Sequence, residues 1–171
     1  MGRWSYSNRW TVEDCKRITT KYLKQHGFFD GGVRSGILTW SKNGQETGKI
    51  SIQVSTLEGE EYIQFIYTQT DRKSGGKTEL DYKVRIVSTA CNYGGKRWWF
   101  ICPLIINGNV CDRRVGVLYL AGHKYFGCRY CYNLTYGSCK ESHKFDGLYR
   151  KIGMNMGITA KQVKEALKGG I

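Results

Sequence analysis

Four cysteines in the second half of the chain are spaced in two pairs that could bind a metal ion. Cys102 and Cys111 are separated by eight residues, and Cys128 and Cys131, which follow after sixteen more, are separated by two. A zinc ion takes four tetrahedral ligands, and two turns that each carry two cysteines can supply them. The Asn-Gly-Asn stretch at 107–109 would let the longer first turn loop out. The spacing therefore predicts a structural site with Zn²⁺ as the cofactor.

Other uses of these cysteines fit the sequence less well. A thioredoxin-like redox pair would be followed by a helix, whereas residues 132–136 have the composition of a strand. Disulfides belong to oxidising compartments, and the N-terminal "MGRWSYSNRW" lacks the apolar segment of a signal peptide. His123 or Cys139 could replace Cys111 as the fourth ligand, and this alternative stays open. Cys91 and Cys139 are otherwise interpreted as free thiols or small apolar residues.

The chain is strongly basic, with a formal charge of +13 from 27 lysines and arginines against 14 acidic residues. Between residues 96 and 151, ten basic residues accompany only three acidic ones. This excess predicts an anionic partner, and aromatic residues between the cations could stack on bases. The tail also fits a helix-turn-helix template whose second helix would expose lysines. The predicted contacts with DNA or RNA are Arg97, Trp99, Arg113, Arg114, Lys124, Arg129, Tyr130, Lys161 and Lys164.

No catalytic motif is recognisable in the sequence. The three histidines, His26, His123 and His143, lie outside any familiar catalytic frame. The chain has no phosphate-binding loop, no Gly-x-Ser-x-Gly elbow and no zinc-deaminase signature. Four thiolates on one zinc would leave no open coordination position for a substrate. The sequence therefore predicts a binding protein and not an enzyme.

Hydrophobic periodicity predicts the elements that position the cysteines. Residues 11–27 have helical spacing, with Thr11 as the cap, Cys15 on the apolar stripe and Gly27 at the end. Thr159 and Gln162 have the spacing of a capping box, which predicts a helix near the C-terminus. Alternating apolar and polar residues predict a series of strands. Four of them form a meander at 36–40, 48–55, 61–69 and 80–87, and four more belong to the ribbon, at 97–102, 113–120, 124–128 and 132–136.

The predicted fold class is α+β. An N-terminal helix and an antiparallel β-meander precede a four-cysteine zinc ribbon and C-terminal helices. The Gly-rich turn at 91–97 is the best boundary, so we predict an N-terminal domain over 1–93, the ribbon over 94–139 and a helical tail over 140–171. No stretch approaches the roughly 20 apolar residues of a membrane span. Clustered cysteines without a signal peptide predict a cytoplasmic protein.

Three segments, "GGKRWWFICP", "CDRRVGVLYL" and "FGCRYCYNLTYGSCKES", resemble a group of uncharacterised bacterial and phage-encoded zinc-ribbon proteins. The similarity covers about residues 94–142, with a looser likeness in the preceding strands. It implies a zinc ribbon formed by the same four cysteines and a phage or prophage setting. The chain departs from the group's pattern at Cys139, where the pattern has glutamine.

Together these features predict a small basic zinc-ribbon protein, phage or prophage related, that binds nucleic acid. The contact would be made by a basic, aromatic surface around a structural zinc ion. The alternative is a phage-encoded, protein-binding inhibitor of a host defence nuclease or of a host nucleic-acid complex. Salt-sensitive retention on DNA or RNA would favour the first hypothesis, and a defined host protein in a pull-down would favour the second.

Overall fold

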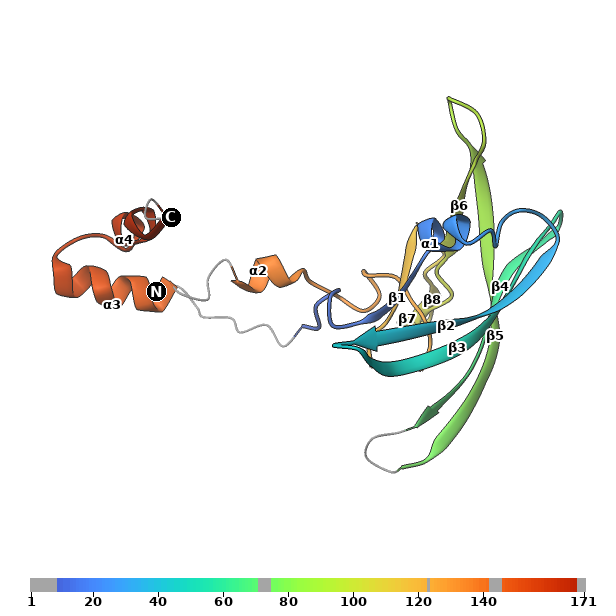
Figure 1. Ribbon diagram of the computed structural model, residues 1–171, viewed down its shortest axis with the longest axis horizontal. Helices are drawn as coiled ribbons and strands as arrows, with labels where there is room; N and C mark the ends of the chain where they lie inside the picture. Colours follow the sequence, from blue (N-terminus) through green and yellow to red (C-terminus); the bar gives the residue numbers. More distant parts are fainter. Residues whose placement is uncertain (1–8, 71–74, 123, 142–145, 169–171) are drawn as a thin grey trace.

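A computed structural model describes residues 9–70, 75–122, 124–141 and 146–168 of the chain. Most of the ordered elements are strands, and the centre of the fold is a six-stranded antiparallel sheet. Its strands follow the order β2 (Val33–Lys42), β3 (Gln45–Leu57), β4 (Glu60–Thr70), β5 (Lys77–Ala90), β6 (Lys96–Ile101) and β9 (Arg114–Val115). Figure 1 shows that this sheet is curled. Within the described ranges, no helix has the length and apolarity needed to cross a bilayer.

The predicted alternation of the meander strands is confirmed. On β3, Ile50, Ile52 and Val54 are at most 5% exposed, while Lys49 and Ser51, which alternate with them, face solvent. Short turns join the strands, and Asn43 and Gly44 between β2 and β3 both have positive φ, as a type I′ turn requires. One face of the sheet is therefore apolar and needs a cover.

The second half of the chain supplies part of that cover. Phe126 and Leu118 are fully buried in the same apolar cluster as the inward residues of the sheet, and Leu23 joins them from the N-terminal segment. The Phe126 ring lies 4.9 Å from the ring of Phe65 and 6.2 Å from that of Trp40, measured between centroids. The segment that carries the second cysteine pair is thus packed directly onto the sheet.

The predicted helix over 11–27 is wrong in its first half. Lys16–Thr19 forms strand β1, which pairs antiparallel with β10 (Val117–Leu120), and helix α1 covers only Thr20–Gln25. Thr19 is the N-cap, because its side chain accepts a hydrogen bond from the backbone N–H of Tyr22 at 3.0 Å. Pairing with β10 satisfies backbone groups that a longer helix would have satisfied internally.

Two details of the N-terminal prediction are confirmed by the structure. Cys15 is buried, and it packs in a second, smaller apolar cluster with Val12, Tyr119 and Leu134. Gly27 has φ +71° directly after the helix, the conformation that suits glycine at a helix end.

The ribbon strands are shorter than predicted. Residues 113–120 split into β9 and β10 at Gly116, and residues 124–128 make only an isolated bridge between Gly127 and Tyr119. Residues 132–136 form no strand beyond a bridge from Thr135 to Thr11, since the backbone N–H groups of Tyr132 and Leu134 turn back to residues 128 and 129. β5 pairs with β6 across the proposed boundary at 93/94, and the division into domains stays a prediction.

Three helices follow, α2 (Gly137–Glu141), α3 (Asp146–Met156) and α4 (Ala160–Lys168). The capping box that begins α4 is confirmed, because the Thr159 N–H donates to the Gln162 side chain at 2.8 Å and the Gln162 N–H donates to the Thr159 hydroxyl at 3.3 Å. The helices α3 and α4 contact each other and lie apart from the sheet in Figure 1.

Candidate metal centre and its basic surroundings

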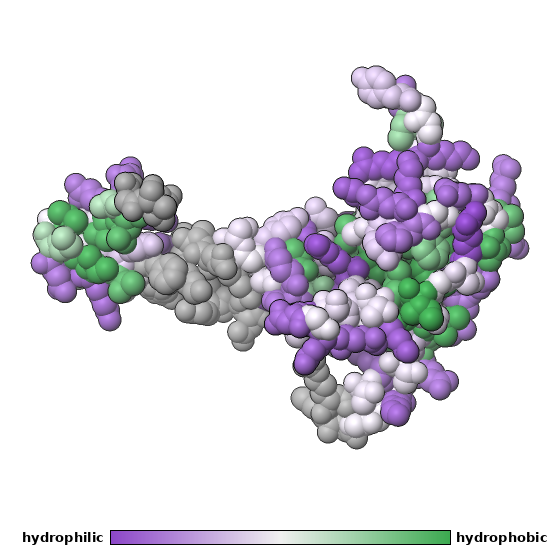
Figure 2. All heavy atoms as spheres, in the orientation of Figure 1, coloured by the Kyte–Doolittle hydropathy of each residue, from purple (hydrophilic) through white to green (hydrophobic). Residues whose placement is uncertain are grey.

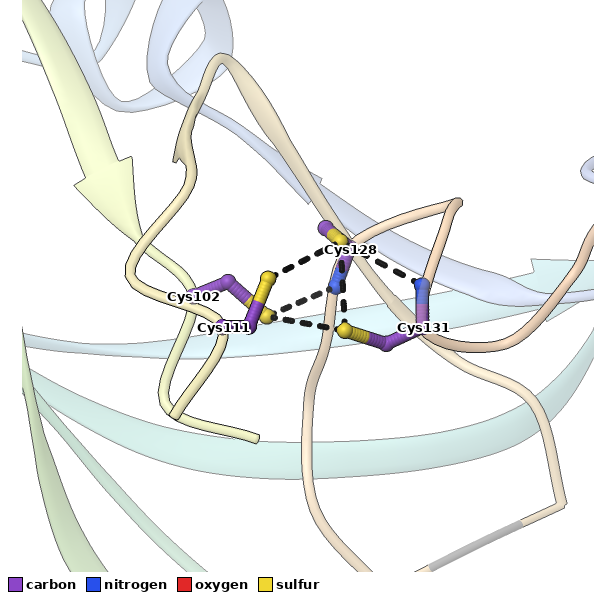
Figure 3. Close-up of side chains that lie close together, drawn as sticks. All are labelled: Cys102, Cys111, Cys128 and Cys131. Carbon is purple, nitrogen blue, oxygen red and sulfur yellow. Dashed lines mark hydrogen bonds between the residues drawn. The ribbon is translucent and has the colours of Figure 1, made fainter. Parts of the chain in front are cut away.

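The four cysteines of the two predicted pairs converge on one point. Their sulfur atoms all lie within 4.8 Å of one another, and Figure 3 shows the side chains pointing toward a common centre. The Sγ–Sγ separations are 3.8 Å from Cys102 to Cys131, 3.8 Å from Cys111 to Cys128 and 3.5 Å from Cys128 to Cys131. A tetrahedral ion with sulfur ligands at about 2.3 Å places the sulfurs about 3.8 Å apart. The cluster therefore has the dimensions of a four-thiolate metal site.

Backbone groups around the cluster favour ionised sulfur. The N–H of Cys128 donates to the sulfur of Cys102 at 3.3 Å, and the N–H of Cys131 donates to that of Cys128 at 3.4 Å (Figure 3). A hydrogen bond with the Cys102 thiol lowers the pKa of the Cys128 thiol to about 4, and the backbone N–H groups of Cys131 and Tyr130 act in the same direction. Further thiolates in so small a space need a cation to offset their repulsion.

The first pair is presented by a small hairpin. Cys102 follows β6, and the residues between the two cysteines form β7 (Ile105–Ile106) and β8 (Asn109–Val110). Asn107 and Gly108 at its tip both have positive φ, so the turn is of type I′. The N–H of Cys111 donates to the carbonyl of Leu104 at 2.9 Å and closes the hairpin. The prediction that the extra residues of this turn loop out is confirmed.

The sheet positions the second pair through a buried tyrosine, Tyr67, and a partly buried one, Tyr82. The hydroxyl of Tyr82 accepts a hydrogen bond from the N–H of Phe126 at 2.8 Å, and the hydroxyl of Tyr67 donates to the carbonyl of Lys124. Burial raises the pKa of both tyrosines, so both hydroxyls stay neutral. These contacts fix the backbone two and four residues before Cys128, and nothing in the local sequence signals them.

The two cysteine pairs also pack against each other. A Cβ on Gly127 would lie 2.1 Å from Cδ1 of Leu104, so the Leu104 side chain packs directly on the glycine backbone where the base of the hairpin crosses the second pair. Gly127 is itself paired with Tyr119 of β10 through two backbone hydrogen bonds of 2.8 and 2.9 Å. Leu104 and Gly127 thus set how closely the pairs approach.

The alternative ligands are placed elsewhere or not described. Cys111, and not Cys139, completes the cluster, while Cys139 lies exposed on α2. His123 and His143 fall outside the described residues. Cys91 is exposed in the turn between β5 and β6.

The predicted arginines form two groups with aromatic rings. In the first, which we call the β6 group, the guanidinium carbons of Arg97 and Arg114 lie 4.1 and 5.7 Å from the centroid of the Trp99 ring. Thr89 orients that ring, because its hydroxyl accepts a hydrogen bond from the indole N–H at 3.0 Å. Arg97 and Arg114 are exposed, so this group places two cations on the surface of the sheet edge.

The second group, the knuckle group, surrounds the Cys128–Cys131 turn. The guanidinium carbons of Arg113 and Arg129 lie 4.6 and 5.1 Å from the centroid of the Tyr130 ring, and Arg129 also lies 5.0 Å from that of Tyr136. Sequence reasoning missed Tyr136, because its partner Arg129 belongs to the preceding turn. Arg113 belongs to the knuckle group and Arg114 to the β6 group. Because these two residues are consecutive in the chain, the two groups adjoin each other.

No acid among the described residues neutralises these arginines. In the described parts of the chain, none of the four has a carboxylate within ion-pair distance. The predicted contact Lys124 is exposed beside the sheet. Lys161 and Lys164 lie on α4, which lies apart from the sheet in Figure 1. The structure therefore gathers six of the nine predicted contacts in two joined groups, while Lys124 and the α4 lysines belong to neither.

Comparison with protein-family models, curated proteins and solved structures finds no match for this chain. The resemblance of residues 94–142 to phage-encoded zinc-ribbon proteins thus stays a prediction. The function of the four sulfurs and of the arginines is therefore inferred from their geometry.

Proposed function

We propose that the protein is a zinc-ribbon protein that binds nucleic acid, with one structural Zn²⁺ held by Cys102, Cys111, Cys128 and Cys131. Sulfur separations near those of a tetrahedral site support the metal, and soft thiolate ligands favour zinc. Four protein ligands fill the coordination sphere, so the ion would stabilise the fold and not bind a substrate. This arrangement favours a binding role over catalysis.

The observation that carries the proposal is the pair of arginine–aromatic groups. A guanidinium that stacks its face on a ring keeps its N–H donors free at the edge, where they can bind phosphate oxygens in a fork. The guanidinium carbons of Arg97, Arg113, Arg114 and Arg129 lie 4.1–5.7 Å from the centroids of such rings, and none has an acidic partner in the portion of the chain that is described. Four preorganised cations without counter-charges suit a polyanion.

Exposed aromatic rings indicate that the ligand is contacted through its bases as well as its phosphates. Tyr130 is 61% exposed and Tyr136 is 45% exposed, although each already contacts an arginine. Rings of this kind stack on unpaired bases with little regard to sequence. The proposed ligand is therefore DNA or RNA with accessible bases. The lysines of α4 would add a second contact if the helical tail also reaches the strand.

Binding can be tested by reversing charge at the joined groups. The triple variant Arg113→Glu, Arg114→Glu, Arg129→Glu should lose most affinity for a labelled oligonucleotide. The slope of log affinity against log salt should become shallower by about 0.7–0.9 for each phosphate that is no longer neutralised. A matched control reverses three exposed cations of the sheet, Arg34, Lys49 and Arg85, and should keep the salt slope of the native protein. Equal losses in both variants would show only a general charge effect and contradict the proposed surface.

The metal proposal has its own test. Protein purified under reducing conditions should contain one equivalent of zinc, measured by elemental analysis. Cobalt substitution should give the visible spectrum of a tetrahedral tetrathiolate site. Absence of metal from freshly reduced protein would overturn the zinc ribbon while leaving the arginine surface to be tested separately.

A host-protein partner is the second proposal, because apolar residues of the helical tail are exposed. Leu148, Met154, Met156 and Leu167 are 53%, 76%, 66% and 58% exposed. Phage-encoded inhibition of a host nuclease would use such a surface for docking. Substituting Met154 and Leu167 with serine should then abolish capture of a defined host protein and leave oligonucleotide binding unchanged.

A further inference from the structure

The hairpin between Cys102 and Cys111 is an apolar projection on a basic chain. Residues 103–110 carry no charge, and Ile105, Ile106 and Val110 are 63%, 45% and 56% exposed. Ile105 pairs with Val110 across the hairpin, and Ile106 pairs with Asn109. Because paired residues share a face and neighbours alternate, aliphatic side chains occupy both faces of the projection. Exposed aliphatic residues at the end of a hairpin have no role in the core of the protein.

The geometry gives this projection a rigid base. Both of its ends are cysteines of the sulfur cluster, and the hydrogen bond from Cys111 to Leu104 closes it. Leu104 packs on Gly127 of the second pair, and the type I′ turn fixes the tip. A rigid apolar hairpin loses little conformational entropy when it inserts into a ligand.

The base of the hairpin adjoins the knuckle group. Arg113 is two residues beyond Cys111, and its guanidinium lies over Tyr130, which stands between Cys128 and Cys131. The sulfurs of Cys111 and Cys128 are 3.8 Å apart, so the base of the hairpin lies directly beside the turn that carries the knuckle group. A ligand that bound the arginines through phosphates would present its bases to the hairpin.

We propose that this hairpin is a wedge that enters nucleic acid where base stacking is interrupted. The inference rests on the proposed nucleic-acid function and names its preferred substrate, which is a duplex with a bulge, a mismatch or a single-strand junction. Aliphatic side chains can insert between bases, and the free energy of unstacking is smallest where the stack is already broken. The adjacent arginines would hold the phosphates on either side.

The experiment compares three labelled duplexes at one salt concentration, namely an intact duplex, one with a two-nucleotide bulge and one with a forked end. The native protein should bind the bulged and forked duplexes about tenfold more tightly than the intact one, because less stacking has to be broken. A 2-aminopurine placed beside the bulge should change its fluorescence on binding as its stacking partner is replaced. This second measurement needs no variant protein.

The double variant Ile105→Ser, Val110→Ser should bind the intact duplex as before and lose the preference. A matched control, Ile37→Ser, changes an aliphatic residue that is 67% exposed on β2 and should keep the preference. Zinc content and circular dichroism of each variant verify that the sulfur cluster remains formed.

The possible failures are distinct. If the native protein binds no oligonucleotide, the proposed function fails and the wedge fails with it. If it binds all three duplexes equally, or leaves the 2-aminopurine signal unchanged, only the wedge is overturned. A hairpin variant that loses self-association or a protein partner, while its duplex preference persists, would assign the projection to a protein interface and also overturn the wedge.

Discussion

The curled sheet and the α3–α4 pair differ in how completely their apolar side chains are buried. The sheet encloses large side chains completely, among them Phe65, Phe100 and Phe126, each 0% exposed. In the described part of the tail, only Gly153 and Val163 are buried, while Met154 and other apolar residues face solvent. Figure 2 shows hydrophobic side chains on the surface of this pair. The first region carries its own core, and the second has little of one.

The sulfur cluster belongs to the well-packed region, that of the curled sheet. The segment before Cys128 is buried through Phe126 and held by hydroxyls of the sheet, so metal and core stabilise the same stretch of chain. Perturbations of the metal or of the sheet core should therefore act together, and perturbations of the tail should stay local. The following predictions test that division.

Removal of the metal should have the largest effect. Structural zinc in small domains contributes about 10–16 kcal/mol of apparent folding free energy. A chelator, or the substitution Cys128→Ser, should therefore deprotect the backbone amides of residues 102–134 in hydrogen-exchange mass spectrometry and leave those of α3 and α4 unchanged. Cys91→Ser is the control, because that thiol is exposed outside the cluster. Metal loss in the control, or unchanged exchange after chelation, would contradict a structural ion.

Truncation of Phe126 should come next. Its ring contacts those of Phe65, Tyr67 and Trp40, and a buried Phe→Ala change costs roughly 3–5 kcal/mol. Phe126→Ala should lower the free energy of unfolding of the zinc-loaded protein and also speed zinc release to a chelator. Tyr93→Ala, at a fully exposed aromatic, should change neither measurement. If zinc release is unaltered in Phe126→Ala, the sheet does not support the metal site.

The sequence predicts the features that depend on residues close together along the chain. Alternation over Ile50, Ile52 and Val54 indicates a strand because the signal and its cause lie within a few residues. The Thr159–Gln162 capping box is equally local. The cysteine spacing identified the four sulfurs that converge, since a type I′ turn at 107–108 absorbs the long first spacing.

The features that the sequence did not predict depend on partners far along the chain. Residues 16–19 have a helical pattern of apolar residues, yet β10, about a hundred residues later, makes them a strand. The hydroxyls of Tyr67 and Tyr82 bind backbone more than forty residues away, so their role has no local signature. The split of Arg113 and Arg114 between two aromatic groups likewise depends on where Trp99 and Tyr130 lie.

Substitution of Gly127 should have an intermediate effect on the metal-bearing region. In Gly127→Ala the new methyl group would meet Leu104 at 2.1 Å, and overpacking of this kind costs about 1–3 kcal/mol. Adding Leu104→Ala removes the two nearest atoms and leaves Cε2 of Tyr132 at 3.1 Å, so the double variant should lose less stability than the sum of the two single variants. Gly116→Ala is the control, because its methyl group would have no neighbour closer than 3.8 Å. Additive losses in denaturant unfolding would show that the two residues do not contact.

The smallest effect should come from Gly153 and should remain in the tail. A methyl group there would lie 2.5 Å from the backbone carbonyl oxygen of Ile158, which cannot move without shifting the connection to α4. The clash, about 1–3 kcal/mol, opposes a gain of about 1 kcal/mol in helix propensity, so Gly153→Ala should separate α3 from α4. Amide exchange should accelerate in residues 146–168 of the full chain while residues 45–70 keep their protection. Met154→Ala, one residue along the same helix and 76% exposed, should alter neither. Faster exchange in the sheet of Gly153→Ala would mean that the two regions are coupled, because a tail with little core of its own can affect the sheet only through contact with it.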